Sequence, residues 1–155
     1  ASGLAENIFT GDLVIIIASG LLTPHTATEV NNIGVFAGVS YTASDGSYVY
    51  SQYWPTGTVA TDIIAYIYDD PYIVYRIQSA GTPAQTNIGN NADVVAGAGS
   101  TSTGQSGFSL NGTMAAGTAT CKIIGLWDGP ANEMGQYAQL EVLINEHLLK
   151  ATAGI

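Results

Sequence analysis

Hydrophobic positions along the chain fall in short blocks or alternate with polar ones, and both patterns predict β-strands. The isoleucine-rich run over residues 12–18 is bounded by glycines and predicts a buried strand. Residues 33–42 and 47–54 flank the turn Ser44-Asp45-Gly46, and an Asp-Gly turn between apolar runs predicts a hairpin. No window carries apolar side chains at helical spacing over the length of an ordinary helix.

Two further hairpins are expected after residue 60. Residues 62–68 and 72–78 flank Asp69-Asp70-Pro71, and residues 120–127 and 137–146 flank a turn that also contains aspartate, glycine and proline. The segment 62–68 is apolar on both faces. Such a strand is expected either between two layers or beneath a partner chain.

Two sets of aromatic side chains recur with a period of two. In the strand expected over 47–54, Tyr48 and Tyr50 share one face, and in the strand expected over 62–68, Ile64, Tyr66 and Tyr68 share one face. The segment 96–120 carries no charge and consists mostly of Gly, Ala, Ser and Thr. It predicts long loops around one short strand near Phe108.

The chain of 155 residues therefore predicts an all-β single domain, an antiparallel sandwich or partly open barrel. About eight strands are expected, with long Gly/Ser/Thr-rich loops and very little helix. Residues 1–10 are interpreted as an extended N-terminal arm and residues 11–155 as the domain. The apolar run over 13–22 is too short to cross a bilayer and follows an aspartate, so it predicts neither a membrane span nor a signal peptide.

Charge narrows the classes of partner. Charged residues make up 10% of the chain, against about 25% in a typical domain. Twelve of them are acidic and three are basic, giving a net charge of −9. Three basic residues cannot neutralise a phosphate backbone or hold an anionic membrane, so nucleic acid and membrane surfaces are excluded as main partners. A surface of Ser, Thr, Asn, Gln and Gly loses little side-chain entropy when a partner covers it. Long charged side chains are typically depleted from interfaces, so this composition favours a component of an assembly.

The residues that could carry chemistry are few. Asp69 and Asp70 lack the nearby oxygen ligands that calcium requires, and aspartate before proline is typical of a turn. Cys121 alone can form neither an intramolecular disulfide nor a zinc site. His25 and His147 are the only histidines. A hydrolase using Asp69, Asp70 or His147 would need these groups clustered in a pocket. No catalytic, cofactor or metal site is predicted.

Two further features concern contacts rather than catalysis. Arg76 is the only arginine and is expected to pair with Asp62 across the hairpin or to stack on a tyrosine. The cluster Tyr53-Trp54-Pro55 could stack on a sugar, anchor a protein interface, or close the end of the core with Trp54.

Several stretches together resemble a family of small virion proteins of tailed bacteriophages. The resemblance rests on residues 34–42, Tyr53-Trp54-Pro55 and residues 62–71, with further similarity in residues 8–14, 122–125 and 142–145. It spans most of the chain, and its motifs are structural rather than an active-site signature.

This resemblance implies a head decoration, or cement, protein on the outer surface of the capsid. Such proteins bind the lattice of the major capsid protein, often as trimers or dimers, and use a terminal arm to hold neighbouring capsomers. By analogy the arm would contribute Leu4, Ile8 and Phe9 to partner binding, and the candidate aromatic cluster adds Tyr53, Trp54 and Pro55. The alternative from a different class is a carbohydrate-binding β-sandwich of an adhesin or phage fibre.

Overall fold

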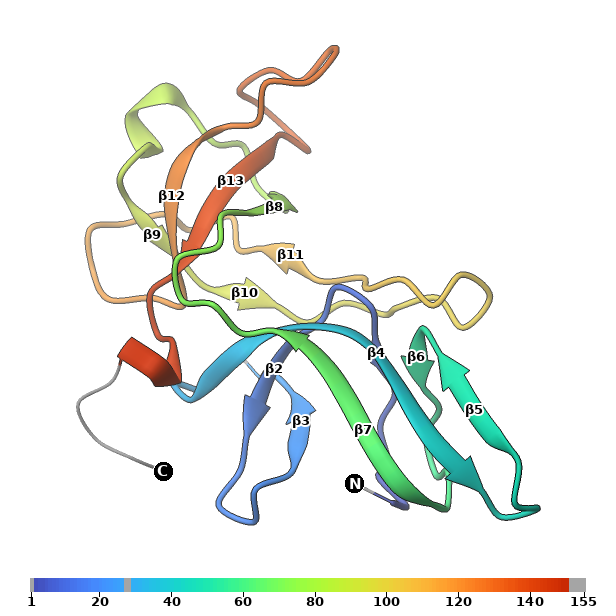
Figure 1. Ribbon diagram of the computed structural model, residues 1–155. Coiled ribbons are helices and arrows are strands. Elements are labelled where there is room, and N and C mark those ends of the chain that lie inside the picture. Colours follow the sequence, from blue (N-terminus) through green and yellow to red (C-terminus); the bar gives the residue numbers. More distant parts are fainter. Residues whose placement is uncertain (1, 27–28, 151–155) are drawn as a thin grey trace.

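The computed structural model, which describes residues 2–26 and 29–150, is an all-β protein built from antiparallel sheets (Figure 1). Over those residues the only helical segments are two 3-10 turns, η1 (Gln85–Asn87) and η2 (Leu148–Lys150). A helix long and apolar enough to cross a membrane does not occur in this part of the chain. The all-β class predicted from the strand and turn pattern is confirmed.

The larger sheet is organised around one long central strand. Its members are β2 (Leu13–Ile16), β3 (Leu22–Pro24), β4 (Asn32–Ala43), β5 (Tyr48–Ser51) and β7 (Ala60–Tyr68). The first part of β4 pairs with β2, and its second part pairs with β5. Along its other edge, β4 pairs with β7 over nearly its whole length. The predicted hairpin around Asp45 is confirmed as β4–β5.

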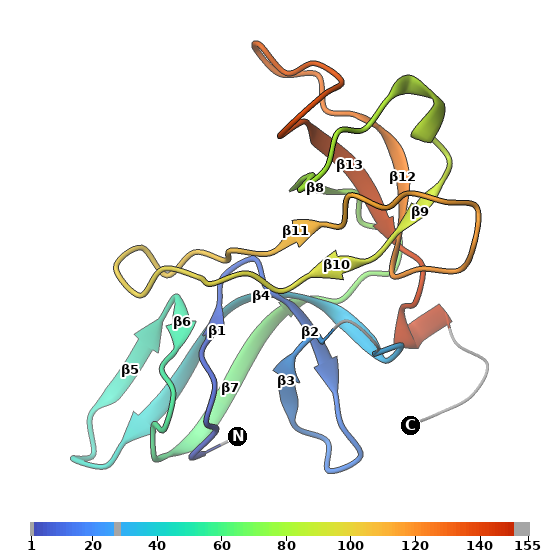
Figure 2. The ribbon, with the colours of Figure 1, turned by 180° about the vertical axis from the view of Figure 1, so that it is seen from behind.

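A second sheet packs above one end of the first (Figure 1). Its strand order is β8–β13–β12–β9, with β8 (Tyr75–Gln78), β9 (Asn91–Ala92), β12 (Cys121–Leu126) and β13 (Gln139–Ile144). The pairing of β12 with β13 confirms the predicted C-terminal hairpin. Seen from behind, the short pair β10 (Val94–Val95) and β11 (Ser109–Leu110) lies between the two sheets (Figure 2).

The hairpin predicted over residues 62–78 is wrong. β7 pairs with β4 and β8 pairs with β13, so the chain passes from one sheet to the other between them. The turn signal Asp69-Asp70-Pro71 marks this crossing, where the Asp70 carboxylate accepts a hydrogen bond from the Tyr72 amide at 2.8 Å. A local turn motif identifies a change of direction without identifying the strand that will be paired next.

Two hydrophobic clusters fill the interior. The first lies with the β8–β13–β12–β9 sheet, and its buried members are Leu13, Ala92, Val94, Leu110, Cys121, Ile123, Ala138, Leu140, Val142 and Ile144. The second lies against β4, with buried members Ile8, Val14, Phe36, Val39, Tyr41, Trp54 and Ala60. The adjacent residues Leu13 and Val14 enter different clusters, because successive side chains of a strand point to opposite faces.

The expected N-terminal arm is folded onto the domain. Within residues 2–10, β1 (Ile8–Phe9) pairs with β6 (Tyr53–Trp54), and the segment before it follows the chain around residues 56–60. The Gly3 amide donates to the Thr58 carbonyl at 2.8 Å. Burial of the apolar side chains of Leu4, Ile8 and Phe9 against the domain stabilises this packed position.

Candidate interaction surface

The six residues predicted to bind a partner do lie together, and three of them are part of the interior. Ile8, Phe9 and Trp54 are buried, and Leu4 packs against the same cluster. The Phe9 ring stacks on Tyr53 with centroids 5.4 Å apart. Ile8, Phe9 and Trp54 are therefore covered within one chain, whereas Leu4, Tyr53 and Pro55 are only partly buried. A role of these six residues in partner binding stays a prediction.

Trp54 closes the core at this end. Only 2% of its surface is exposed, and its ring meets Tyr41 edge to face at a centroid distance of 5.3 Å. Its indole Nε1 has no hydrogen-bond partner. Of the three roles open to this residue from the sequence, the structure shows packing within the domain. Pro55 and Tyr53 are partly buried beside it.

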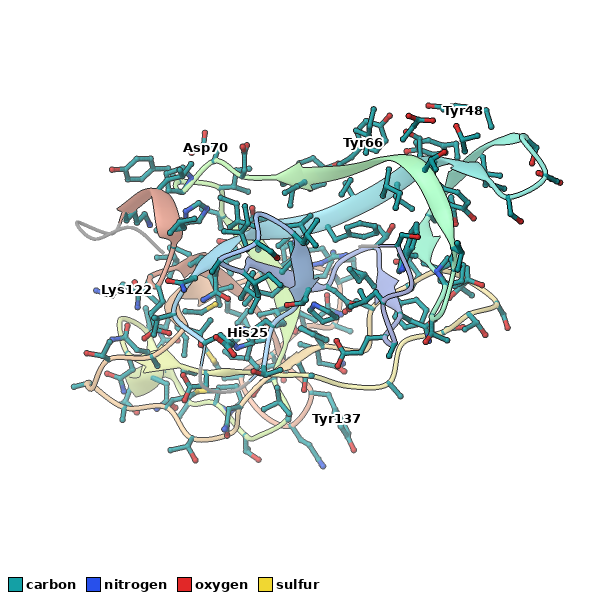
Figure 3. All side chains as sticks on the ribbon, turned by 90° about the horizontal axis from the view of Figure 1, so that it is seen from below. His25, Tyr48, Tyr66, Asp70, Lys122 and Tyr137 are labelled. Carbon is teal, nitrogen blue, oxygen red and sulfur yellow. The ribbon has the colours of Figure 1, made fainter. Side chains whose placement is uncertain are left out.

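A different set of aromatic side chains forms a free surface, which we call the tyrosine face. It lies on the outer side of the β5–β4–β7 sheet and consists of Tyr48, Tyr50, Ile64, Tyr66 and Tyr68, all exposed. Figure 3 shows Tyr48 and Tyr66 projecting from the same side of the molecule, away from the body of the protein.

Strand register explains why these side chains gather. Ser40 of β4 is opposite Tyr50 on β5 and Ile64 on β7, and Gly38 is opposite Tyr66. The strands beside β4 therefore present large side chains while β4 between them presents small ones. An extra β4 residue between Phe36 and Gly38 shifts the register here. After this bulge the small residues face outward while Val39 and Tyr41 remain in the core.

The rings of Tyr50 and Tyr66 lie over the small residues of β4. Their centroids are 5.8 Å apart and their planes are inclined by 46°. The Ser40 and Tyr66 hydroxyl oxygens are hydrogen-bonded at 3.1 Å. A β-carbon at Gly38 would stand 3.2 Å from the Tyr50 hydroxyl, and Gly38 has a φ of +143°. A larger residue at this position would displace the Tyr50 ring, so this part of the tyrosine face depends on glycine at position 38.

The period-two tyrosines are visible in the sequence, but the residues predicted to bind a partner lie elsewhere. Tyr53-Trp54-Pro55 is the denser aromatic cluster in the sequence, whereas Tyr50 and Tyr66 are 16 positions apart. Only the pairing of both β5 and β7 with β4 brings these two rings together. The feature of the sequence that indicated this surface is the strand at residues 62–68, which is apolar on both faces. One face of that strand packs into the core, and the other remains exposed.

Carboxylates border the tyrosine face. Asp45 lies in the β4–β5 turn, Asp62 near the start of β7, and Asp69 and Asp70 directly after its end, all exposed. Hydrogen bonds from the Ser47 hydroxyl and amide lower the pKa of Asp45 from its ordinary value. That carboxylate is therefore ionised at neutral pH.

Basic side chains are engaged on other elements. The Arg76 guanidinium lies 4.3 Å from the centroid of the Trp127 ring. In the β8–β13 pair, the residue opposite Arg76 is Glu141. The prediction that Arg76 would pair with Asp62 or stack on a tyrosine is corrected, because β8 is not paired with β7. Lys150 donates to the Ile144 carbonyl at 2.9 Å and lies 5.1 Å from the Tyr72 ring.

A buried polar cluster joins the two sheets near η2. His25, Asn32 and His147 are each at most 1% exposed. The Asn32 side-chain amide donates to the Glu146 carbonyl at 3.0 Å, and His147 Nδ1 accepts from the Leu149 amide at 3.2 Å. Burial lowers the pKa of both histidines, so both imidazoles are neutral at pH 7. His147 anchors the segment at η2 through this bond, whereas neither ring nitrogen of His25 has a hydrogen-bond partner.

The hydrolase alternative finds no assembled site around its candidate residues. Asp69 and Asp70 are exposed, whereas His147 is buried with its Nε2 atom unpartnered. A cleft of about 270 Å³ lies between the sheets, and none of these three residues lines it. Cys121 does line it, but burial raises the pKa of its thiol to about 12. Within residues 2–26 and 29–150, no three His, Cys, Asp or Glu side chains gather as metal ligands would.

Comparison with known proteins adds no relative. Protein-family models, curated proteins and solved structures were each searched, and none of the three comparisons gave a match.

Proposed function

We propose that this chain is a non-enzymatic structural protein of a tailed-bacteriophage virion. It would act as a decoration protein that binds the outer face of the major capsid protein lattice and stabilises the shell. The tyrosine face is the observation that carries the proposal, because it is a preformed aromatic surface on a charge-poor domain. The sequence resemblance supplies the capsid as the partner.

The composition of this face matches that of protein interfaces. Tyrosine is enriched in the central residues of interfaces, while lysine and glutamate are depleted. Long charged side chains are absent from the five residues of the tyrosine face. Tyrosine has two rotatable side-chain bonds, so little side-chain entropy is lost when a partner binds. The Ser40–Tyr66 hydrogen bond reduces that loss further, because it already fixes one ring.

Sedimentation with purified capsids that lack this protein tests the proposal. We expect saturable co-sedimentation at a stoichiometry set by the lattice, and capsids that resist heat-induced rupture better once the protein is bound. Sedimentation velocity of the protein alone gives its oligomeric state, for which the resemblance implies a trimer or a dimer. Absence of co-sedimentation at micromolar protein concentrations would contradict the proposal.

Carbohydrate binding is the second candidate, and one observation favours it. The inclined, exposed rings of Tyr50 and Tyr66 offer stacking to a sugar, and their hydroxyl groups offer hydrogen bonding. A glycan array distinguishes the two functions. Reproducible glycan binding that is lost in Tyr50→Ser and retained in Tyr137→Ser would favour a lectin. Trp54→Ala does not serve this purpose, because Trp54 is in the core.

A further inference from the structure

We infer that the tyrosine face binds a cationic protein surface, one that presents arginine side chains to the inclined rings of Tyr50 and Tyr66. The inference rests on the proposed function and specifies the chemistry of the partner surface. Its basis is the distribution of charge over the chain together with the geometry of the face.

The basic residues, unlike the acidic ones, are confined to residues 76–155 of the sequence. Residues 1–75 contain seven of the 12 carboxylates and none of the three basic residues, since Arg76 is the first cation in the chain. The strands that form the tyrosine face all lie within this half. The sheet itself therefore contributes no cation, and one from outside it, Lys150 of η2, lies 5.1 Å from the Tyr72 ring, beyond the Asp69–Asp70 end of the face.

The carboxylates are placed where they can meet a partner's charges. Asp45 and Asp62 stand at one end of the tyrosine face, Asp69 and Asp70 stand at the other, and all four are exposed. Figure 3 shows Asp70 on the same side of the molecule as Tyr48 and Tyr66, with Lys122 away from it. An aromatic centre within an acidic rim is electrostatically complementary to a basic surface.

Arginine fits the centre of this face better than lysine. Its guanidinium is planar, weakly hydrated and stacks on aromatic rings, whereas an ammonium is a strongly hydrated point charge. The chain already shows this contact internally, with Arg76 over Trp127 at 4.3 Å. The two tyrosine rings are fixed 5.8 Å apart and leave their outer surfaces exposed, by 64% for Tyr50 and 39% for Tyr66.

A second copy of the chain is a poor occupant of the same face. Two tyrosine faces brought together would place one acidic rim against another, and like charges across an interface oppose association. Homo-oligomers, if formed, would use a different surface. The occupant is therefore a protein with the opposite charge, which under the proposed function is the outer surface of the capsid lattice.

Binding to capsids that lack the protein gives the first test. Tyr50→Ser/Tyr66→Ser is expected to weaken binding at least tenfold, as loss of two central aromatic contacts does. Neutralising the rim with Asp45→Asn/Asp62→Asn is expected to weaken it roughly fivefold and to reduce its sensitivity to salt. Matched controls are Tyr137→Ser, an exposed tyrosine on the opposite side in Figure 3, and Asp128→Asn; both should bind as the unmodified protein does.

A peptide probe tests the chemistry independently of capsids. Hexa-arginine and hexa-glutamate peptides with blocked ends are titrated into labelled protein while amide NMR shifts are followed. The arginine peptide alone should shift the resonances of β5 and β7, and Tyr50→Ser/Tyr66→Ser should abolish those shifts. Thermal melts establish that the double variant is folded. If the double tyrosine variant is unfolded, the Asp45→Asn/Asp62→Asn variant, which keeps both tyrosine rings, replaces it in the comparison. The arginine peptide should then cause smaller shifts in this variant than in the unmodified protein.

The two tests separate the two claims. Arginine-peptide shifts at the tyrosine face without capsid binding would support the cationic partner and overturn the capsid function. Capsid binding unaffected by the tyrosine and aspartate substitutions would leave the capsid function standing and overturn this inference. Peptide shifts that are absent, or that spread over both sheets and persist in the double variant, would also overturn it.

Discussion

Aromatic side chains in this chain differ in function according to what lies beneath them. Tyr41 and Trp54 are enclosed by apolar neighbours and stabilise the core. Tyr50 and Tyr66 lie over Gly38 and Ser40, which raise no side chain high enough to cover them. Small residues in a central strand thus leave the rings on the adjacent strands exposed while holding them in place.

Trp54→Ala should destabilise the domain by about 3–5 kcal/mol, as removal of a buried aromatic ring does. The residue is 2% exposed and its ring is in edge contact with Tyr41. Urea denaturation followed by circular dichroism measures the change. Trp54→Phe should lose less, because it keeps most of the apolar volume and removes an unpartnered N–H. An unchanged unfolding midpoint in Trp54→Ala would contradict a core role.

The buried histidines make stability depend on pH. Burial lowers the pKa of His25 and His147 below the ordinary 6.5, so below that pH the unfolded chain binds more protons than the folded one. Their stabilising contribution is complete above the unfolded-state value and is lost as the pH falls through the folded-state value. We therefore expect the free energy of unfolding to decrease as the pH falls from about 7.5 to about 5.5.

His147→Asn tests this dependence. Its amide oxygen can accept the Leu149 hydrogen bond that His147 Nδ1 now accepts, but it does not titrate. Urea midpoints at several pH values should show a shallower decline in the variant. Burial raises the pKa of Asp12 and of Glu146, which act in the opposite sense nearer their ordinary values of 3.8 and 4.5. An identical pH slope in both proteins would exclude His147 as a contributor.

At the scale of elements, the N-terminal strand is a structural part of the domain. β1 is short, yet it contributes Ile8 to the core and covers β6. Ile8→Ala should cost about 2–4 kcal/mol of unfolding free energy. Ile17→Ala, at a position 37% exposed, should cost less than about 1 kcal/mol and serves as the control. Equal effects of the two substitutions, measured by urea denaturation, would indicate that β1 is not anchored.

Local signals predicted local structure and failed for partners distant in sequence. Asp45-Gly46 correctly indicated the β4–β5 hairpin, because that turn itself determines the pairing. The turn at Asp69-Asp70-Pro71 indicated a reversal, but the choice of β4 for β7 and of β13 for β8 depends on the core. The tyrosine face was out of reach for the same reason, since it requires two strands to pair with opposite edges of β4.

At the scale of the whole molecule, the two sheets carry different surfaces. The sheet built around β4 presents exposed tyrosines and lies entirely within the part of the chain that has no basic residue. The sheet built around β12 and β13 contains Arg76 and Lys122. The side that carries the tyrosine face is the one that we infer binds a cationic partner.

Electron cryomicroscopy of capsids reconstituted with this protein tests the central claim most directly. The account predicts ordered density on the outside of the shell, oriented so that the β5–β4–β7 sheet faces the capsid and Tyr50 and Tyr66 contact basic side chains. Ordered density in which that sheet faces solvent, or capsids that remain bare at saturating protein, would contradict it.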